Sequence, residues 1–178
     1  MITATRRAAL LGALSVPTVA GFAAWRMRHG EVSRLVHDPA LAAGRRFAAA
    51  AKAGGAPSRA VEGDRIRFAR EVLEARPSLI AGVTRHADFL LIADAAREAG
   101  YAEAAVLDTR AGRCAGAECR PGWTALGRMS RAAGTEWPEA LANYAIDPSR
   151  VTVRASTGSW FDGKDSGLVL GWVLARRA

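Results

Sequence analysis

The chain has 178 residues, half of them hydrophobic, and a net charge of +8 at neutral pH. This length fits one domain with its own hydrophobic core, so no second domain is expected. Four arginines stand in the first 30 residues, and without them 21 basic residues face 17 acidic ones, a net charge of +4. These basic residues are scattered among acidic ones, so we predict no nucleic-acid partner.

The first 30 residues have the composition of an export signal or a membrane anchor. An uncharged, mostly apolar run covers residues 8–25, with Arg6 and Arg7 before it and Arg26 and Arg28 after it. The run exceeds the roughly 7 to 15 apolar residues of a cleaved leader and approaches the roughly 20 that span a bilayer. We therefore predict a retained, single-pass anchor in contact with lipid. Cleavage near Ala23, which would release a soluble periplasmic protein, is the alternative.

The start of this leader also carries a short motif. Thr5, Arg6 and Arg7 directly precede the apolar run, and Leu10 follows them at the expected place. This stretch resembles a bacterial twin-arginine export signal, although Ala9 and Leu11 replace the large apolar residue and the lysine of that pattern. The resemblance covers the leader alone and implies a domain that faces the periplasm from the inner membrane. An ordinary secretory leader or signal anchor is the alternative.

Residues 31–57 are expected to hold a linker and a helix that Asp38 caps and that Gly54 ends. Residues 58–178 are expected to form an α/β domain. Apolar strands at 58–62, 78–83 and 104–107 alternate with amphipathic helices at 63–77 and 84–101. Short connections between such strands predict parallel strands joined by right-handed crossovers, with helices on both faces of the sheet. The predicted fold is a three-layer, doubly-wound-like α/β domain.

The last third of the chain is expected to add two helices, at 123–133 and 136–145, and a C-terminal antiparallel hairpin formed by 150–156 and 167–177. Cys114 and Cys119 lie in a glycine-rich loop before these helices. In an oxidising periplasm we expect them to form a disulfide. A redox-active pair or a zinc site would need a different spacing or further ligands.

Polar residues follow the predicted strands at their carboxyl ends, where ligands bind in open parallel sheets. The tentative ligand-binding residues are Thr84, Arg85, His86, Asp88, Asp108 and Arg110, with Glu62, Asp64 and Thr109 at the same ends. The backbone N–H groups at the start of helix 84–101, together with Arg85, would suit phosphate, sulfate or carboxylate. The alternative is structural, because Thr84 and Asp64 are good helix caps and Asp88 suits a first helical turn.

The sequence contains none of the common catalytic patterns for nucleophilic, nucleotide-dependent or zinc-dependent chemistry. We therefore assign no catalytic residue, metal or cofactor. Trp160 and Phe161 stand in a polar loop, where an exposed aromatic pair would suit a protein interface. The predicted function is an anchored periplasmic accessory or binding subunit that docks to a larger envelope complex, for example a respiratory one. An exported enzyme or small-anion-binding protein is the alternative.

Overall fold

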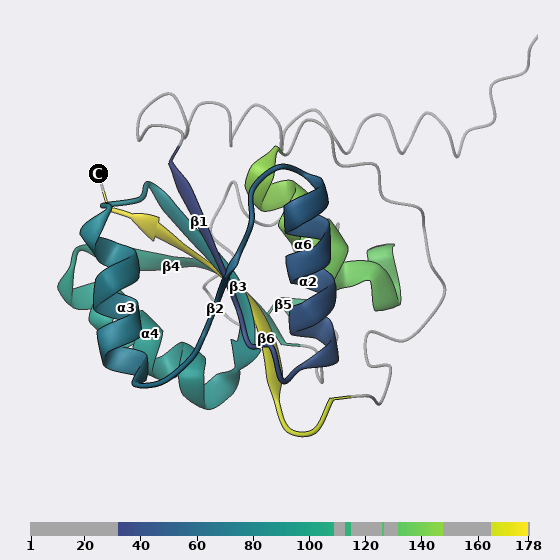
Figure 1. Ribbon diagram of the computed structural model, residues 1–178, viewed down its shortest axis with the longest axis horizontal. Coiled ribbons are helices and arrows are strands. Elements are labelled where there is room, and N and C mark those ends of the chain that lie inside the picture. Colours follow the sequence, from purple (N-terminus) through teal and green to yellow (C-terminus); the bar gives the residue numbers. More distant parts are fainter. Residues whose placement is uncertain (1–31, 109–112, 115–125, 127–131, 148–164, 178) are drawn as a thin grey trace, which may run out of the picture.

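The structure is a computed structural model, and it describes residues 32–108, 113, 114, 126, 132–147 and 165–177. These residues form three layers, with a mixed β-sheet between two pairs of helices (Figure 1). The strands are β1 (Ser33–His37), β2 (Arg59–Ala60), β3 (Leu79–Arg85), β4 (Tyr101–Asp108), β5 (Arg113–Cys114) and β6 (Val169–Arg176). The helices are α2 (Ala42–Ala53), α3 (Arg65–Glu74), α4 (His86–Glu98) and α6 (Trp137–Ile146), and the short 3₁₀ turn η2 (Gly134–Glu136) precedes α6. The predicted α/β class and its three layers are confirmed.

The sheet has the strand order β2-β1-β3-β6-β4-β5. β1 pairs in parallel with β2 and with β3, whereas β6 is antiparallel to both of its neighbours, β3 and β4. β3 and β4 therefore run in the same direction, as expected, although β6 separates them. The predicted C-terminal strand exists as β6 and lies inside the sheet. The other arm of the predicted hairpin, 150–156, is outside the described residues.

The structure adds a strand that the sequence did not predict. Residues 33–37, which we assigned to a linker, form β1 and pair with strands on both sides. Leu35 and Val36 are the two fully buried residues of this strand. Two buried apolar residues between polar neighbours are too short a pattern to identify a strand. The linker assignment for this stretch is wrong, because the sheet already begins at Ser33.

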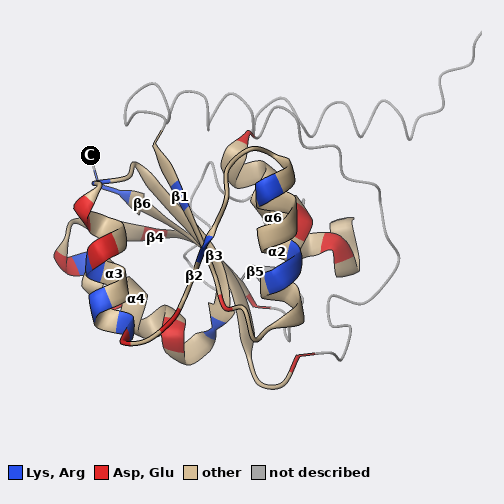
Figure 2. Cartoon of the chain, viewed as in Figure 1, with Lys and Arg blue, Asp and Glu red and all other residues tan. Residues whose placement is uncertain are grey.

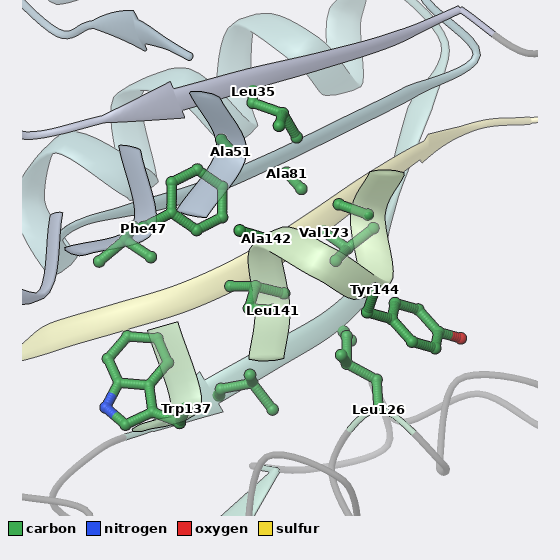
Figure 3. Close-up of a cluster of buried hydrophobic side chains, with 14 of the residues drawn as sticks. Leu35, Phe47, Ala51, Ala81, Leu126, Trp137, Leu141, Ala142, Tyr144 and Val173 are labelled. Carbon is green, nitrogen blue, oxygen red and sulfur yellow. The ribbon is translucent and has the colours of Figure 1, made fainter. Parts of the chain in front are cut away.

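Each face of the sheet has its own hydrophobic core. On one face α2 and α6 bury Phe47, Trp137 and Leu141 against the strands (Figure 3). On the other face α3 and α4 cover Trp172, whose ring centroid lies 5.5 Å from that of Phe89. The charged residues of the helices lie mainly on their outer surfaces (Figure 2). This division explains why the predicted strands are apolar on both faces.

The observed helix starts confirm one predicted cap and correct two others. Asp64 accepts a 2.7 Å hydrogen bond from the backbone N–H of Arg67 and caps α3 as predicted. Asp38 does not cap α2, because its Oδ1 accepts a hydrogen bond from Ala40 N in a turn and the helix begins four residues later. Thr84 does not cap α4, because it belongs to β3.

Several sequence predictions fall outside the described residues. They concern the leader and its apolar run 8–25, most of the helix predicted at 123–133, and Thr109, Arg110, Cys119, Trp160 and Phe161. These therefore stay predictions. Within the described part of the chain, no helix has the length and apolar character needed to cross a bilayer.

Candidate functional site

The carboxyl ends of β1, β3 and β4 lie at the same end of the sheet, which we call its carboxyl edge. The last residues of these strands are His37, Arg85 and Asp108. β6 begins at this edge, and its first two residues, Val169 and Leu170, pair with Arg85 and Asp108 respectively. The strand inserted between them separates these two residues by two strand spacings, about 10 Å. The polar edge is where the sequence placed it, but Asp108 is not beside Arg85.

The junction between β1 and β3 is the topological switch point of the sheet. From here α2 leaves toward one face and α4 toward the other (Figure 1). In open α/β sheets such points commonly bind ligands. Asp38 lies here and is 4% exposed, with its Oδ2 3.1 Å from Arg85 Nη1. The Arg85 side chain is 43% exposed, so a buried carboxylate holds a guanidinium that still reaches solvent.

The segment before β6 occupies the amino-terminal ends of both helices at the switch point. The two carboxylate oxygens of Asp165 accept hydrogen bonds from the backbone N–H groups of Ala42 and Ala43, at 2.5 and 2.9 Å. The carbonyl of Leu168 accepts a 3.0 Å hydrogen bond from the N–H of His86. Such N–H groups are the ones that bind anions at helix starts. Here the chain supplies its own acceptors.

The other predicted ligand residues have varied surroundings. Thr84 is fully buried, and its hydroxyl accepts a 3.0 Å hydrogen bond from Trp172 Nε1 and donates to Arg85 O at 3.1 Å. Asp88 lies in the first turn of α4 and pairs with Arg65 at 2.9 Å. The side chains of His86 and Glu62 are exposed. Of these residues, the structure brings Arg85 and His86 to the switch point with access to solvent.

A pair that sequence reasoning missed joins β1 to the edge strand β2. The hydroxyl of Ser58 lies 2.8 Å from Nδ1 of His37, and both residues are half-buried. Burial lowers the pKa of His37 from its ordinary value, against the charge of Asp38, a hydrogen bond with the Arg59 backbone and the charge of Glu62, which all raise it. Burial thus favours the neutral imidazole. The two residues are 21 positions apart, so their pairing could be predicted only if residues 33–37 were first recognised as a strand.

A shallow, open hollow of about 320 Å³ lies between β2 and α3, lined by Arg59, Glu62, Asp64, Arg67, Phe68 and Glu71. Its charged groups largely bind one another. Arg59 lies over the ring of Phe68, 4.9 Å from the centroid, and also forms an ion pair with Glu71. Asp64 is engaged as the α3 cap. Among the described residues, no group of three or more His, Cys, Asp or Glu side chains gathers as a metal site would require.

Comparisons with protein-family models, with curated proteins and with solved structures found no match. The structural class of this protein therefore rests on its own fold and site. It is a three-layer α/β domain with a mixed sheet, and the polar groups at its switch point are held mainly by contacts within the chain.

Proposed function

We propose that this protein is an exported, membrane-anchored accessory or binding subunit that docks to a larger envelope complex, for example a respiratory one. One observation supports this role over ligand chemistry. At the switch point, where a small ligand would be expected, Asp165 accepts hydrogen bonds from two N–H groups at the start of α2, and Leu168 accepts one from the first N–H group of α4. A domain whose own chain takes up part of this ligand position is suited to work through protein contacts at its surface.

The leader supplies the second part of the proposal. An apolar run at 8–25 that follows a twin-arginine-like motif would hold the folded domain at the inner membrane, on the periplasmic side. An anchored domain is confined close to its membrane partners, which raises their effective concentration. This arrangement favours an accessory subunit, because modest surface contacts then suffice for stable docking.

The described surface offers one contact point for such a partner. Leu90 and Leu91 are consecutive residues of α4, 51% and 45% exposed, on the outer layer of the domain. Large apolar side chains that stay exposed together are candidates for protein contact. Trp160 and Phe161, outside the described residues, are the second candidate contact.

The experiment is a mild-detergent purification of the tagged full-length protein from its native membrane, with mass spectrometry of the co-purified proteins and of the N-terminus. We expect a stoichiometric partner and an intact leader. Replacing Leu90 and Leu91 by serine, or Trp160 and Phe161 by alanine, should release the partner. The control is Val32→Ser, which removes a comparable exposed apolar side chain, 50% exposed, at another place on the surface. A lone protein cut near Ala23 would contradict both the anchor and the accessory role.

The alternative function is binding of a small anion at the switch point, and the half-exposed guanidinium of Arg85 supports it. Asp38 fixes this guanidinium, and fixed arginines bind carboxylate and phosphate well. A phosphate or dicarboxylate ligand should raise the melting temperature of the wild type but not of Arg85→Gln. Arg70→Gln, an exposed arginine in the middle of α3, is the control and should behave as the wild type. A broad panel of anions without any shift would rule this function out.

A further inference from the structure

Four arginines lie at the other end of the sheet, where β1 and β3 begin and β6 ends. They are Arg34 in β1, Arg76 after α3, and Arg176 and Arg177 at the end of β6. All four are exposed. Backbone hydrogen bonds connect this edge, because Ser78 N donates to Val32 O, Arg176 N donates to Ser78 O and Arg177 N donates to Gly100 O. In Figure 2 the basic segment of β1 and the basic end of β6 lie at the end of the sheet marked by the C-terminus. We call these four residues the arginine edge.

Three members of the arginine edge lie on the face that α3 and α4 cover. Side chains alternate along a strand, so Arg34 shares a face with Val36, and Arg176 shares the same face with Leu174. Arg76 follows the end of α3 on this side. Tyr101 lies between two of them along the chain contacts, because it pairs with Arg176 across β4 and β6 and its hydroxyl donates to the carbonyl of Pro77, the residue after Arg76. Burial raises the pKa of Tyr101, and the positive charges of Arg176 and Arg76 act against that rise.

The arginine edge carries a positive charge that no ion pair among the described residues neutralises. Within the described residues, none of its four guanidinium groups forms an ion pair, whereas Arg59, Arg65, Arg85 and Arg97 all do. Two exposed acids, Glu74 and Glu98, end α3 and α4 nearby, and the partial negative charge of those helix ends adds to them. Among the described residues, four arginines against two carboxylates leave this edge positive.

The leader joins the domain at this same edge. Val32 is 50% exposed and directly precedes β1, and six residues, 26–31, separate it from Trp25 at the end of the apolar run. The seven residue-to-residue steps from Trp25 to Val32 span at most about 25 Å even when fully extended. A leader held in a bilayer therefore keeps the arginine edge within about 25 Å of the headgroups. In that interval of the sequence Arg26 and Arg28 add two positive charges and Glu31 adds one negative charge, a net gain of one.

We propose that the arginine edge docks on anionic phospholipid headgroups of the bilayer that holds the leader, and so fixes the orientation of the domain on the membrane. This inference rests on the proposed anchor. A positive edge beside a membrane attachment point complements a negative headgroup layer, and arginine binds phosphate groups with two parallel hydrogen bonds. Docking would turn the opposite edge, with the switch point, away from the membrane. Each arginine near an anionic surface is expected to favour the docked state about fivefold.

The test uses the full-length protein in nanodiscs that carry a spin-labelled headgroup lipid, with amide relaxation measured by NMR. In phosphatidylglycerol discs at low salt we expect strong broadening of amides at the arginine edge, including Gly100 and Arg177. Broadening should fall in phosphatidylcholine discs and at high salt. Arg176→Gln with Arg177→Gln should lower the docked-to-undocked ratio about 25-fold. Arg67→Gln with Arg70→Gln, which removes the same charge from the outer surface of α3, should leave it unchanged.

The possible failures are distinguishable. Equal broadening in both lipids and in all variants would mean that the leader alone brings the edge near the membrane, and would overturn the docking proposal while the anchor stands. Broadening of the α2 or α3 surface in place of the edge would overturn it as well. A full-length protein that does not enter the discs would refute the proposed anchor and, with it, the docking that depends on it.

Discussion

The side chain of Asp165 takes up backbone N–H groups at the start of α2 that a ligand could otherwise bind. Its carboxylate binds two backbone N–H groups at the start of α2, a helix whose own N-cap residue, Leu41, has no side-chain acceptor. Replacing Asp165 by alanine leaves these donors without their charged partner. We expect a loss of about 1 to 2 kcal/mol in the free energy of unfolding, measured by urea denaturation. Glu62→Gln, an exposed carboxylate in a loop, should change it by less than about 0.5 kcal/mol.

A glycine explains how closely α2 approaches the switch point. A Cβ atom on Gly44 would lie 2.1 Å from the backbone carbonyl oxygen of Asp38, which cannot move without shifting the β1 end. Gly44→Ala should therefore destabilise the fold by about 3 kcal/mol, although alanine favours helices. Gly54→Ala is the comparison, because the one short contact of its Cβ, 2.7 Å, would be with the end of the flexible Ile146 side chain, and its other neighbours lie at 3.5 Å or more. Similar unfolding energies for the two variants would contradict this account.

The positions of the candidate ligand residues in the fold could be predicted from the sequence, but their contact partners could not. Arg85, His86 and Asp88 were found because the end of a buried strand is legible in sequence. The ion pair between Asp38 and Arg85 joins residues 47 positions apart and depends on β1, which was not predicted. Asp165 looks like one residue of a polar turn. Its contact with α2 spans more than 120 residues, and no local pattern encodes such a partner.

At the scale of elements, His37 connects β1 to the edge strand β2 and makes that connection sensitive to pH. Burial lowers its folded pKa below the unfolded value of about 6.5, so the folded state resists protonation. The His37 contribution to stability is present above pH 6.5 and is lost as the pH falls through the folded pKa. We expect wild type to lose more unfolding free energy than His37→Gln between pH 7 and pH 5. The control His86→Gln, at an exposed histidine, should follow the wild type.

The central position of β6 predicts an order of local stability. β6 pairs along its length with β3 and β4 and buries seven of its eight residues, whereas β2 contributes two residues at one margin of the sheet. Native-state hydrogen exchange should therefore find the slowest amides in β3, β6 and β4, and faster exchange in β2. Amides of β2 that exchange only by global unfolding would refute this order. A continuous apolar strand at the C-terminus was predictable, but its place between β3 and β4 was not, because strand order depends on pairing across the whole sheet.

At the scale of the whole molecule, the two edges of the sheet differ in kind. At the carboxyl edge the buried acid Asp38 pairs with Arg85, and the half-buried acid Asp165 holds the start of α2 in place. At the amino edge four arginines without ion pairs to other described residues surround the point where the leader enters. A domain polarised in this way has a defined side to present to a membrane and another to present to a partner. This polarity follows from the fold, since all parallel strands begin at one edge and end at the other.

The export route is also a property of the whole chain, and substitution of Arg6 and Arg7 tests it. Arg6→Lys with Arg7→Lys preserves the positive charge, which satisfies an ordinary secretory leader, but removes the twin arginine. We expect the double variant to keep the domain inside spheroplasts, protected from added protease, while wild type is digested. Arg26→Lys with Arg28→Lys makes the same change beyond the apolar run and should be exported normally. Unimpaired export of the Arg6 and Arg7 variant would assign the leader to the ordinary secretory route. It would leave the anchor in place, because the apolar run is unchanged.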